Sequence, residues 1–464
     1  MADYERVVLI MTDTQRHDMF GCYRQTGLLT PCIDQLAAEG RLFEQAYTTQ
    51  PVCQPARAAL FFGRYPHEIN CWSNSTGPDR TAWSIGQRLQ QHGVHTAYIG
   101  KWHLDGGDYF GTGQCPDGWD QDYWFDMRCY LDGLSEDDRR RSRQTETNRE
   151  GIEASFTYAS QCSDRAIRFL EHYHDEPFFL TVSYDEPHGP FLCPEPYASI
   201  YQDYTFPASC NIDDPLTDKP ASQRAWAGSQ LEGDRPTPVI REPDYFGCHS
   251  FVDSQIGRVV AAIRRHTPDA CIIFTSDHGD FLHSHRLSGK GPAVYEEITH
   301  IPLIISAPGL PSGCRDHAPV SHINIAPTVF DLMGLPQPKA FSGKSLLPQL
   351  TGAVQRVNEQ VFIGFGRYEI DHDGFGGFQP LRAAYDGRYK LAINLMDRDE
   401  LYDLQQDPAE MRNLIDSPAH QTIRDRLHDA ILDHQNETRD PFRGYWWERR
   451  TWRQDARPAT WDYT

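Results

Sequence analysis

Cys53 lies in a sequence setting that could make a cysteine reactive. Pro55 can occupy the first turn of a helix, where its missing N–H is not needed, and the following residues up to Leu60 favour helix. The free N–H groups and the dipole at such a helix start attract anions, and Arg57 lies one turn away. The segment fits a reactive site, and it fits equally well a buried structural cysteine.

Other polar side chains follow short apolar runs that indicate buried strands. Ligands of open α/β sheets bind at the carboxyl ends of the strands, so these side chains could form a site there. Each has a simpler reading as a turn residue, a surface residue or a hydrogen-bonded core histidine. The runs and the residues that follow them are 7–11 with Asp13, 96–99 with Lys101 and His103, 177–184 with His188, and 271–275 with Asp277 and His278.

The composition excludes several classes of protein. The 464 residues carry 44 basic against 65 acidic side chains, a formal charge of −21, which argues against a nucleic-acid partner but not against a small anionic substrate. No apolar run reaches the roughly 18 residues of a membrane helix, and the first residues lack the features of a signal peptide, so we expect a cytoplasmic protein. The 12 cysteines show no C-x-x-C pair and are expected to be reduced.

Alternating strand and helix patterns predict an α/β fold, with a large, mostly parallel sheet between helices, over residues 1–355. Thr30-Pro31 should open a helix that Gly40 closes, and 41–47 should be a strand. Residues 105–149 are expected to form an irregular insertion, and 194–244 a loop. Further helices are predicted over 150–174, 246–265 and 322–333.

The remaining residues, 356–464, are predicted to form a small C-terminal α+β subdomain. Three strand-like runs suggest an antiparallel meander. The tail from Gly444 is too aromatic for a solvated tail, so we expect it to pack within the chain or on another subunit of a homo-oligomer. The strand-like runs are 361–365, 381–385 and 389–393, and the tryptophans of the tail are Trp446, Trp447, Trp452 and Trp461.

Three blocks carry a family resemblance. Cys53-Gln54-Pro55-Ala56-Arg57 resembles the Cys-x-Pro-x-Arg signature of type I sulfatases, in the alkaline phosphatase superfamily. Gly100-Lys101-Trp102-His103-Leu104 resembles the second signature of that family, and 277–305 resembles its third block. The resemblance implies an alkaline phosphatase-like fold and release of sulfate from a sulfate monoester. It also implies a maturation enzyme that oxidises Cys53 to formylglycine (3-oxoalanine).

The metal ligands that the resemblance implies are Asp13, Asp277, His278 and the formylglycine made from Cys53. Two positions depart from the common family pattern. Many members have Asp-Asp at the first site, where this chain has Thr14 in second place, and Asp-Asn at the second site, where it has His278. Calcium is the family default, but a nitrogen ligand favours manganese more than usual, with magnesium a further alternative.

The catalytic roles also come from the resemblance. One hydroxyl of the formylglycine hydrate attacks sulfur, and the leaving alcohol takes a proton from His188 or Lys290. His103 then acts as the base that allows sulfate to be expelled. Lys101 and Arg57 hold the hydrate and offset its charge.

Three other functions stay open. Phosphonate monoester hydrolases of the same superfamily also combine Asp-His with formylglycine, and Asn74 matches an asparagine that they carry. Phosphonate monoester or phosphodiester hydrolysis is therefore the alternative activity. A non-catalytic binding protein with this fold is expected to have lost one of the core polar residues. An enzyme that uses unmodified Cys53 would need a histidine paired with the thiol.

The substrate is predicted only by class. An exo-acting sulfatase on a sulfated mono- or disaccharide suits an intracellular chain, while the sugar and the sulfated position stay open. Residues 366–378 could reach the rim of the pocket or form an exposed loop. The residues that could line a sugar pocket are Trp72, Trp102, Tyr109, Arg367 and His372, with Asn74 as a further contact.

Overall fold

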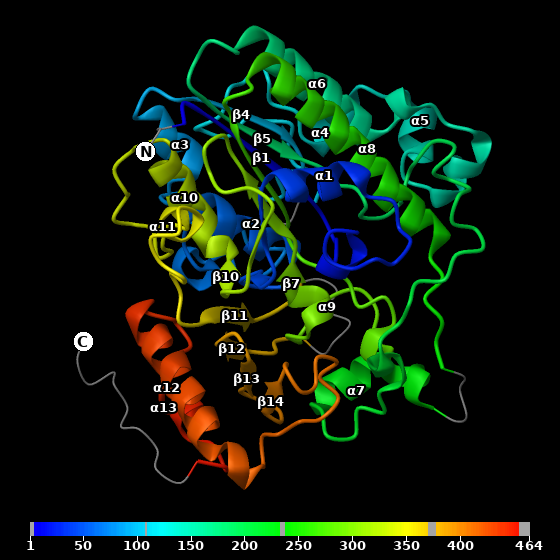
Figure 1. Cartoon of the computed structure of the whole chain (residues 1–464). Helices are drawn as coiled ribbons and strands as arrows, with labels where there is room; N and C mark the ends of the chain where they lie inside the picture. Colours follow the sequence, from blue (N-terminus) through cyan, green and yellow to red (C-terminus); the bar gives the residue numbers. More distant parts are fainter. Residues whose placement is uncertain (1–3, 107–108, 233–236, 370–376, 454–464) are drawn as a thin grey trace.

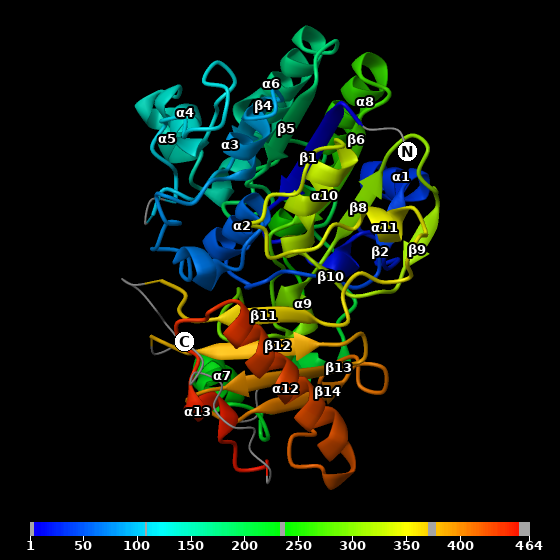
Figure 2. The same ribbon diagram turned by 90° about the vertical axis from the view of Figure 1, so that its left-hand side faces the viewer.

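The computed structural model describes residues 4–106, 109–232, 237–369 and 377–453. Its centre is a seven-stranded sheet (Figure 1), whose strands lie in the order β4-β5-β1-β6-β8-β2-β9, as the labels of Figure 2 show. The first four strands of that order run parallel, β8 is antiparallel to both its neighbours, and β9 is parallel to β2. The strands are β1 (Arg6–Thr12), β2 (Arg41–Phe43), β4 (His95–Gly100), β5 (Phe178–Ser183), β6 (Cys271–Ser276), β8 (Leu303–Ser306) and β9 (Cys314–Asp316).

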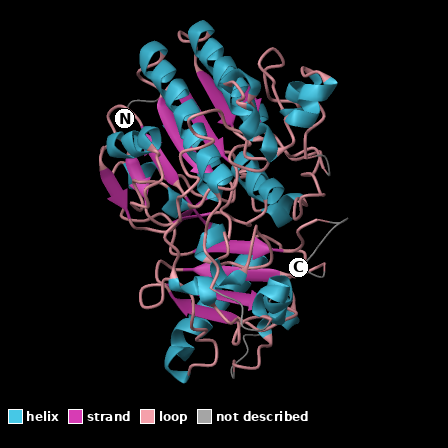
Figure 3. Ribbon diagram, turned by 90° about the vertical axis from the view of Figure 1, so that its right-hand side faces the viewer, coloured by secondary structure: helices cyan, strands magenta, loops and turns pink. Residues whose placement is uncertain are grey.

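Helices cover both faces of this sheet, as Figures 2 and 3 show. Side chains alternate between the faces of a strand, so Val8 and Ile10 pack with one group of helices and Val7 and Leu9 with the other. The first group is α1 (Pro31–Glu39), α4 (Met127–Asp132), α6 (Tyr158–His172) and α8 (Pro243–His266). The second is α2 (Cys53–Phe62), α3 (Ile85–Gln90), α10 (Ile325–Leu332) and α11 (Leu347–Leu350). The predicted fold class is confirmed.

Several predicted boundaries are wrong. The insertion 105–149 contains α4 and α5 (Glu136–Arg141), and the predicted loop 194–244 contains α7 (Ala221–Ala227). The predicted helix over 150–174 begins at Tyr158, because the Thr157 side chain accepts the Ser160 N–H and caps it. The strand expected over 41–47 is split into β2 and β3 (Ala46–Tyr47), and β3 joins β7 (His300–Ile301) and β10 (Val320–Ser321) in a second small sheet.

The C-terminal part is a four-stranded antiparallel sheet that lies beside α9 (Glu296–Thr299) (Figures 1 and 2). The meander gains a fourth strand, and α12 packs on one face of the sheet. Trp447 is buried in that packing and Trp452 is partly buried against it, but Trp446 is 63% exposed, so the expectation of a packed tail is only partly correct. Trp461 lies outside the described residues. The elements are β11 (Val361–Phe365), β12 (Leu381–Tyr385), β13 (Tyr389–Asn394), β14 (Glu400–Asp403), α12 (Gln421–Glu437) and α13 (Tyr445–Glu448).

The division of the chain between residues 355 and 356 stays a prediction. None of the described helices combines the length and the apolar composition that crossing a bilayer requires.

Candidate active site

Four adjacent strands end at one edge of the large sheet, and each is followed by a charged side chain. Asp13 follows β1, Lys101 follows β4, Asp185 follows β5 and Asp277 follows β6. The strands are parallel neighbours, so these four side chains come from consecutive positions along the edge. All four are almost fully buried.

Cys53 enters this edge from the start of α2. It is the first residue of the helix, and Val52 at the N-cap supplies no capping side chain. The Asn74 Oδ1 atom accepts the Gln54 N–H at 3.0 Å and thereby satisfies one free donor of the first turn. Asn74 thus supports the helix start beside Cys53.

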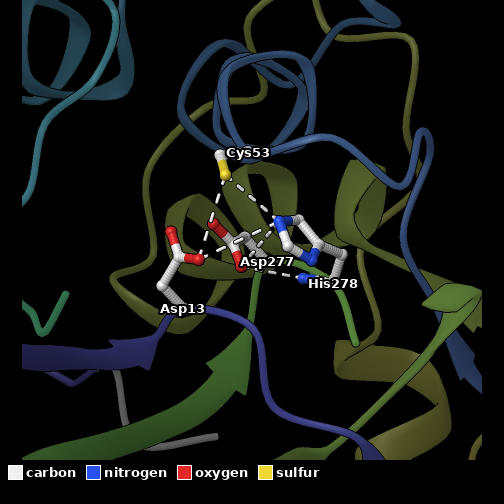
Figure 4. Close-up of side chains that lie close together, drawn as sticks. All are labelled: Asp13, Cys53, Asp277 and His278. Atoms are coloured by element: carbon white, nitrogen blue, oxygen red, sulfur yellow. Dashed lines mark hydrogen bonds and ion pairs between the residues drawn. The ribbon is translucent and has the colours of Figure 1, made fainter. Parts of the chain in front are cut away.

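Asp13, Cys53, Asp277 and His278 form a compact buried cluster (Figure 4). One ligand atom from each lies within 4.8 Å of those of the other three. The Cys53 Sγ atom is 3.2 Å from His278 Nε2 and 3.9 Å from Asp13 Oδ1. Residues that stand far apart in the sequence therefore offer four donor atoms to one point.

This donor set fits a divalent cation. His278 Nδ1 lies 2.8 Å from the carbonyl oxygen of Gly279, which can only accept, so Nδ1 carries the proton and Nε2 presents its lone pair to the cluster. Two carboxylates and one imidazole nitrogen are ligands that calcium, magnesium or manganese accept. The Cys53 thiol is a soft donor, and an oxygen at position 53 would suit such a hard cation better.

Three cations surround the cluster. Arg57 joins the two carboxylates, with Nη2 3.1 Å from Asp13 and Nε 3.1 Å from Asp277. Lys101 Nζ lies 2.7 Å from Asp13 Oδ2. Lys290 Nζ lies 2.8 Å from Cys53 Sγ and 2.9 Å from His278 Nε2. Arg57 and Lys101 are paired with carboxyl groups, so Lys290 is the cation best placed to hold an anionic ligand.

The two carboxyl groups that share Arg57 differ in acidity. Burial raises the pKa of Asp13, but the Lys101 ammonium and other nearby cations outweigh burial and hold that pKa well below its ordinary value. Burial and the negative charge of Asp13 together raise the pKa of Asp277 to about 7. Lys101 keeps its proton, because Asp13 and Asp185 raise the pKa of its ammonium despite burial.

Two histidines complete the edge. His103 has a positive φ of 54° and is buried, and within the described part of the chain its Nδ1 has no hydrogen-bond partner. His188 lies in the loop after β5, where its Nδ1 is 3.0 Å from the hydroxyl oxygen of Tyr109. Burial and the nearby Lys101 ammonium lower the pKa of His188 to about 4.

The structure adds Asp185 and Ser183, which the sequence did not single out, and gives Thr14 a contact. Asp185 pairs with Lys101 at 2.9 Å, and Ser183 Oγ accepts an Arg57 N–H at 2.8 Å. Thr14 donates its hydroxyl to Asp13 Oδ1 at 2.5 Å. Asp185 had a usable signal, because it follows a strand as Asp13 and Asp277 do. Ser183 carried no such signal, because it lies within the strand.

Trp102 does not lie as expected. It is a core residue, 5% exposed, whose ring packs against other aromatic rings. Tyr109 is partly exposed at the site. The Tyr109 hydroxyl lies among Lys101, Asp185 and His188. The aromatic partners of Trp102 are Phe61, Tyr98, Trp119 and Trp124.

The remaining pocket predictions are not decided by the structure. Trp72 is partly exposed and its ring approaches Gly366, close to Arg367 in the chain. The neighbouring Tyr368 carbonyl accepts the Asn74 N–H at 2.9 Å, which ties this segment to the site. His372 lies outside the described residues.

The fold and site define a hydrolase of the alkaline phosphatase superfamily. The chain belongs to the sulfatase family: the Sulfatase model matches residues 5–335, and the model for the C-terminal part of N-sulphoglucosamine sulphohydrolase matches 285–437. It is therefore a sulfuric ester hydrolase, as the resemblance of its signatures implied.

Similar proteins match along nearly the whole chain. "Uncharacterized sulfatase YidJ" of Escherichia coli (strain K12) is 44% identical over 97% of this chain and 91% of its own length. The structure of BT4656 in complex with its substrate D-glucosamine-2-N,6-O-disulfate superposes with a TM-score of 0.77 at 21% identity, over 95% of this chain and 99% of that one. The phosphonate monoester hydrolase of Agrobacterium radiobacter gives the same TM-score at 24% identity, over 93% and 96%. These two structures confirm the alkaline phosphatase-like fold.

Proposed function

We propose that this sulfatase hydrolyses a sulfate monoester of a mono- or disaccharide in an exo-acting manner. It would use a formylglycine made from Cys53 and one divalent cation. The observation that carries the proposal is the convergence of Asp13, Cys53, Asp277 and His278 on one buried point ringed by cations. That arrangement can bind a divalent cation and a sulfate group side by side.

Asp13, Asp277 and His278 would hold the cation. The bound cation and the formylglycine would together supply Lewis-acid charge stabilisation and the oxygen nucleophile. Calcium is the choice that the resemblance favours, while the His278 nitrogen favours manganese more than usual. The oxygen that oxidation places at position 53 suits either ion better than the thiol does.

The residues around the cluster have separable tasks. Arg57 fixes the two carboxylates relative to one another, and Lys101 offsets the charge of Asp13. Lys290 faces position 53 and would bind the sulfate oxygens there. His188 would exchange a proton with the leaving alcohol, and the neutral His103 would accept a proton from position 53.

A sugar substrate is supported by two observations on similar proteins. BT4656 was solved with a sulfated glucosamine, and the C-terminal family model is that of a sulphoglucosamine sulphohydrolase. Arg367, which follows β11, and Trp72, whose ring approaches Gly366, would contact the sugar. The cytoplasmic location, a homo-oligomeric state and the maturation enzyme stay predictions.

The test begins with Cys53 itself. The protein is produced with and without a formylglycine-forming maturase, and the peptide that contains residue 53 is weighed by mass spectrometry. We expect the mass of the aldehyde or its hydrate only with the maturase, together with about one equivalent of bound divalent cation by elemental analysis. Full activity with an unmodified thiol would contradict the formylglycine.

Substrate class is tested in the same preparations. Sulfate release is measured from sulfated mono- and disaccharides and 4-nitrophenyl sulfate, with a phenylphosphonate monoester alongside. Cys53→Ala is the blank, and Cys162→Ala, which removes another buried thiol in α6, is the matched control. We expect one sugar sulfate to exceed the aryl ester, with Cys162→Ala close to wild type. Faster turnover of the phosphonate would overturn the proposal in favour of the alternative activity.

A further inference from the structure

The hydroxyl group of Tyr109 connects three residues of the site. It lies 2.6 Å from Asp185 Oδ1, 3.0 Å from His188 Nδ1 and 3.1 Å from Lys101 Nζ. A phenol has one proton to donate and two lone pairs to accept with. These three neighbours therefore use the full hydrogen-bonding capacity of the hydroxyl, and none is left for a substrate.

The direction of each hydrogen bond follows from its partners. Lys101 is an ammonium group and can only donate, and its three N–H bonds match Asp13, Asp185 and Tyr109 at 2.7, 2.9 and 3.1 Å. Burial raises the pKa of Asp185, but Lys101 outweighs it and keeps the carboxyl ionised, so Asp185 can only accept. The Tyr109 proton must then go to Asp185. The remaining lone pair of Tyr109 faces His188.

The carbonyl oxygen of Gly189 fixes the tautomer of His188. It lies 3.2 Å from the same Nδ1 atom, and a carbonyl oxygen can only accept. Nδ1 therefore faces two acceptors, the Tyr109 and Gly189 oxygens, and must carry a proton. The other ring nitrogen, Nε2, makes no hydrogen bond to the described residues and is the atom through which His188 can exchange a proton.

We propose that Tyr109 and Asp185 are positioning residues that hold His188 with its proton on Nδ1 and with Nε2 directed to the leaving oxygen of the ester. This inference rests on the proposed function and assigns the leaving-group proton to His188 rather than to Lys290. It also gives Tyr109 a role other than contact with the sugar.

In the proposed step the sulfuryl group is transferred and the leaving oxygen gains one proton. The bond between sulfur and the bridging oxygen breaks, its electron pair stays on that oxygen, and the oxygen takes the proton from Nε2. The sulfuryl group goes to the nucleophile at position 53. His188 is left neutral with its Nδ1 proton in place, and it takes up a new Nε2 proton from solvent when the next anionic ester binds beside the ring.

The resting charge of His188 agrees with this sequence of events. Burial and Lys101 keep the imidazole neutral in the free protein. A bound sulfate ester brings negative charge next to the ring and acts in the opposite direction, because an anion stabilises the imidazolium. Tyr109 and Asp185 keep Nδ1 protonated in both states.

The test uses esters that differ in how much they need a proton. A 4-nitrophenolate leaves without help, whereas phenol and sugar alcohols need protonation. We expect Tyr109→Phe in the matured enzyme to lower kcat/KM for phenyl and sugar sulfates about 100-fold, and for 4-nitrophenyl sulfate only about threefold or less. KM should change little. His188→Ala should show the same selective loss, and the double variant should lose no more than His188→Ala alone.

Tyr204→Phe is the matched control, because it removes a tyrosine hydroxyl whose hydrogen bond, to the Thr26 carbonyl oxygen, lies outside the site. We expect its kcat/KM for every ester to equal that of wild type. The inference would be overturned if Tyr109→Phe lowered kcat/KM equally for every ester. It would also be overturned if the only change were a higher KM for sugar sulfates, which would indicate that Tyr109 contacts the sugar.

A second measurement does not depend on any variant of Tyr109 folding. Nitrogen-15 NMR of labelled wild-type protein, with the His188 signals identified by their loss in His188→Ala, reports which ring nitrogen is protonated. We expect a proton on Nδ1 and a bare Nε2. A proton on Nε2 alone would overturn the inference while leaving the sulfatase activity standing, whereas a matured wild type that releases no sulfate would overturn the proposed function as well.

Discussion

Two buried lysines show how differently this chain treats a positive charge. Lys390 in β13 lies 2.8 Å from Glu296 and 2.9 Å from Glu410, and it ties the C-terminal sheet to α9. Lys290 is equally enclosed, yet its neighbours are the Cys53 thiol and an imidazole nitrogen. Within the described chain no carboxylate lies within 4.0 Å of Lys290.

The two lysines have different roles in the protein. Glu296 supplies the counter-charge of Lys390, because the Lys390 ammonium outweighs burial and holds the pKa of Glu296 below its ordinary value, while burial raises the pKa of Glu410 to about 8. Such a closed cluster needs no ligand and contributes to holding two parts of the fold together. Among the described residues Lys290 has no carboxylate partner within ion-pair distance, so an anionic ligand can supply the counter-ion. Lys390 therefore stabilises the fold, whereas Lys290 is available to bind an anionic ligand.

The largest effect should come from removing the binding lysine. We expect Lys290→Met to lower kcat/KM for sulfate esters by about 10³-fold, because a preorganised charge on the reacting group is lost. The melting temperature should stay within a few degrees of wild type, since no carboxylate loses its partner. Steady-state kinetics and calorimetry on the same preparation measure both quantities. A large drop in melting temperature would show that Lys290 also stabilises the fold, as Lys390 does.

The opposite pattern is expected for the structural lysine. Lys390→Met leaves Glu296 and Glu410 buried without their cation, which should lower the free energy of unfolding by about 3–5 kcal/mol. Urea titration measures that change. The protein that remains folded should keep its kcat/KM, and a parallel loss of activity in fully folded protein would show that the two clusters are coupled.

Glu186 provides a third case, a buried carboxyl with no cation within ion-pair distance among the described residues. Its Oε1 accepts the Ala159 N–H, while burial and the neighbouring Asp185 raise its pKa to about 8. The unfolded chain ionises near the ordinary value, so between those two pKa values the folded state binds more protons and stability falls as pH rises.

Glu186→Gln removes that titration. We expect wild type to lose about 2–4 kcal/mol more unfolding free energy than the variant between pH 5 and pH 8. Urea titrations at the two pH values measure the difference. If the free energy of unfolding changed with pH equally in the two proteins, Glu186 would be ionised in the folded protein and its pKa would not be raised.

The smallest effect concerns Asn74. Asn74→Ala removes the acceptor for the Gln54 N–H at the start of α2 and should cost about 1 kcal/mol of stability. Activity should fall by less than about tenfold, because the residue acts through the helix start. Asn74→Asp keeps an acceptor oxygen and should restore stability. A 100-fold loss of activity at unchanged stability would instead place Asn74 on the ester, as the alternative phosphonate hydrolase predicts.

The large sheet could be predicted because its strands are short, continuous apolar runs that end in polar residues. Asp13 and Asp277 follow two of those runs, whose continuous apolar sequence indicates burial on both faces of the sheet, although each residue would also fit an ordinary turn. The short helix α5 was missed because its sequence consists only of Glu, Asp and Arg, so no apolar face supported its N-cap, Ser135. Helix α4 buries Met127, Tyr130 and Leu131, but its six residues are too few to show a helical period in the sequence.

The parts of the site that escaped prediction depend on the directions of side chains. Trp102 could equally face a pocket or the core, and only the packed rings around it decide. The Tyr109 hydroxyl reaches Asp185 through folding of a long insertion, which no periodicity reports. The sequence shows which side chains can donate or accept hydrogen bonds, whereas the fold determines which of them pair.

Cys53 is 1% exposed, and His278 and Lys290 cover its sulfur. If Cys53 is converted as proposed, the maturation enzyme must reach it before those residues dock. Residue 290 leaves the ribosome about 10 to 50 seconds after residue 53 at ordinary rates of synthesis. The parallel pairing of β1 with β6 must likewise wait until residues 271–276 have been made, and it is slow to form. The order in which the chain is made therefore provides a time window for the modification, and a molecule that folds before it is modified has its thiol sealed inside.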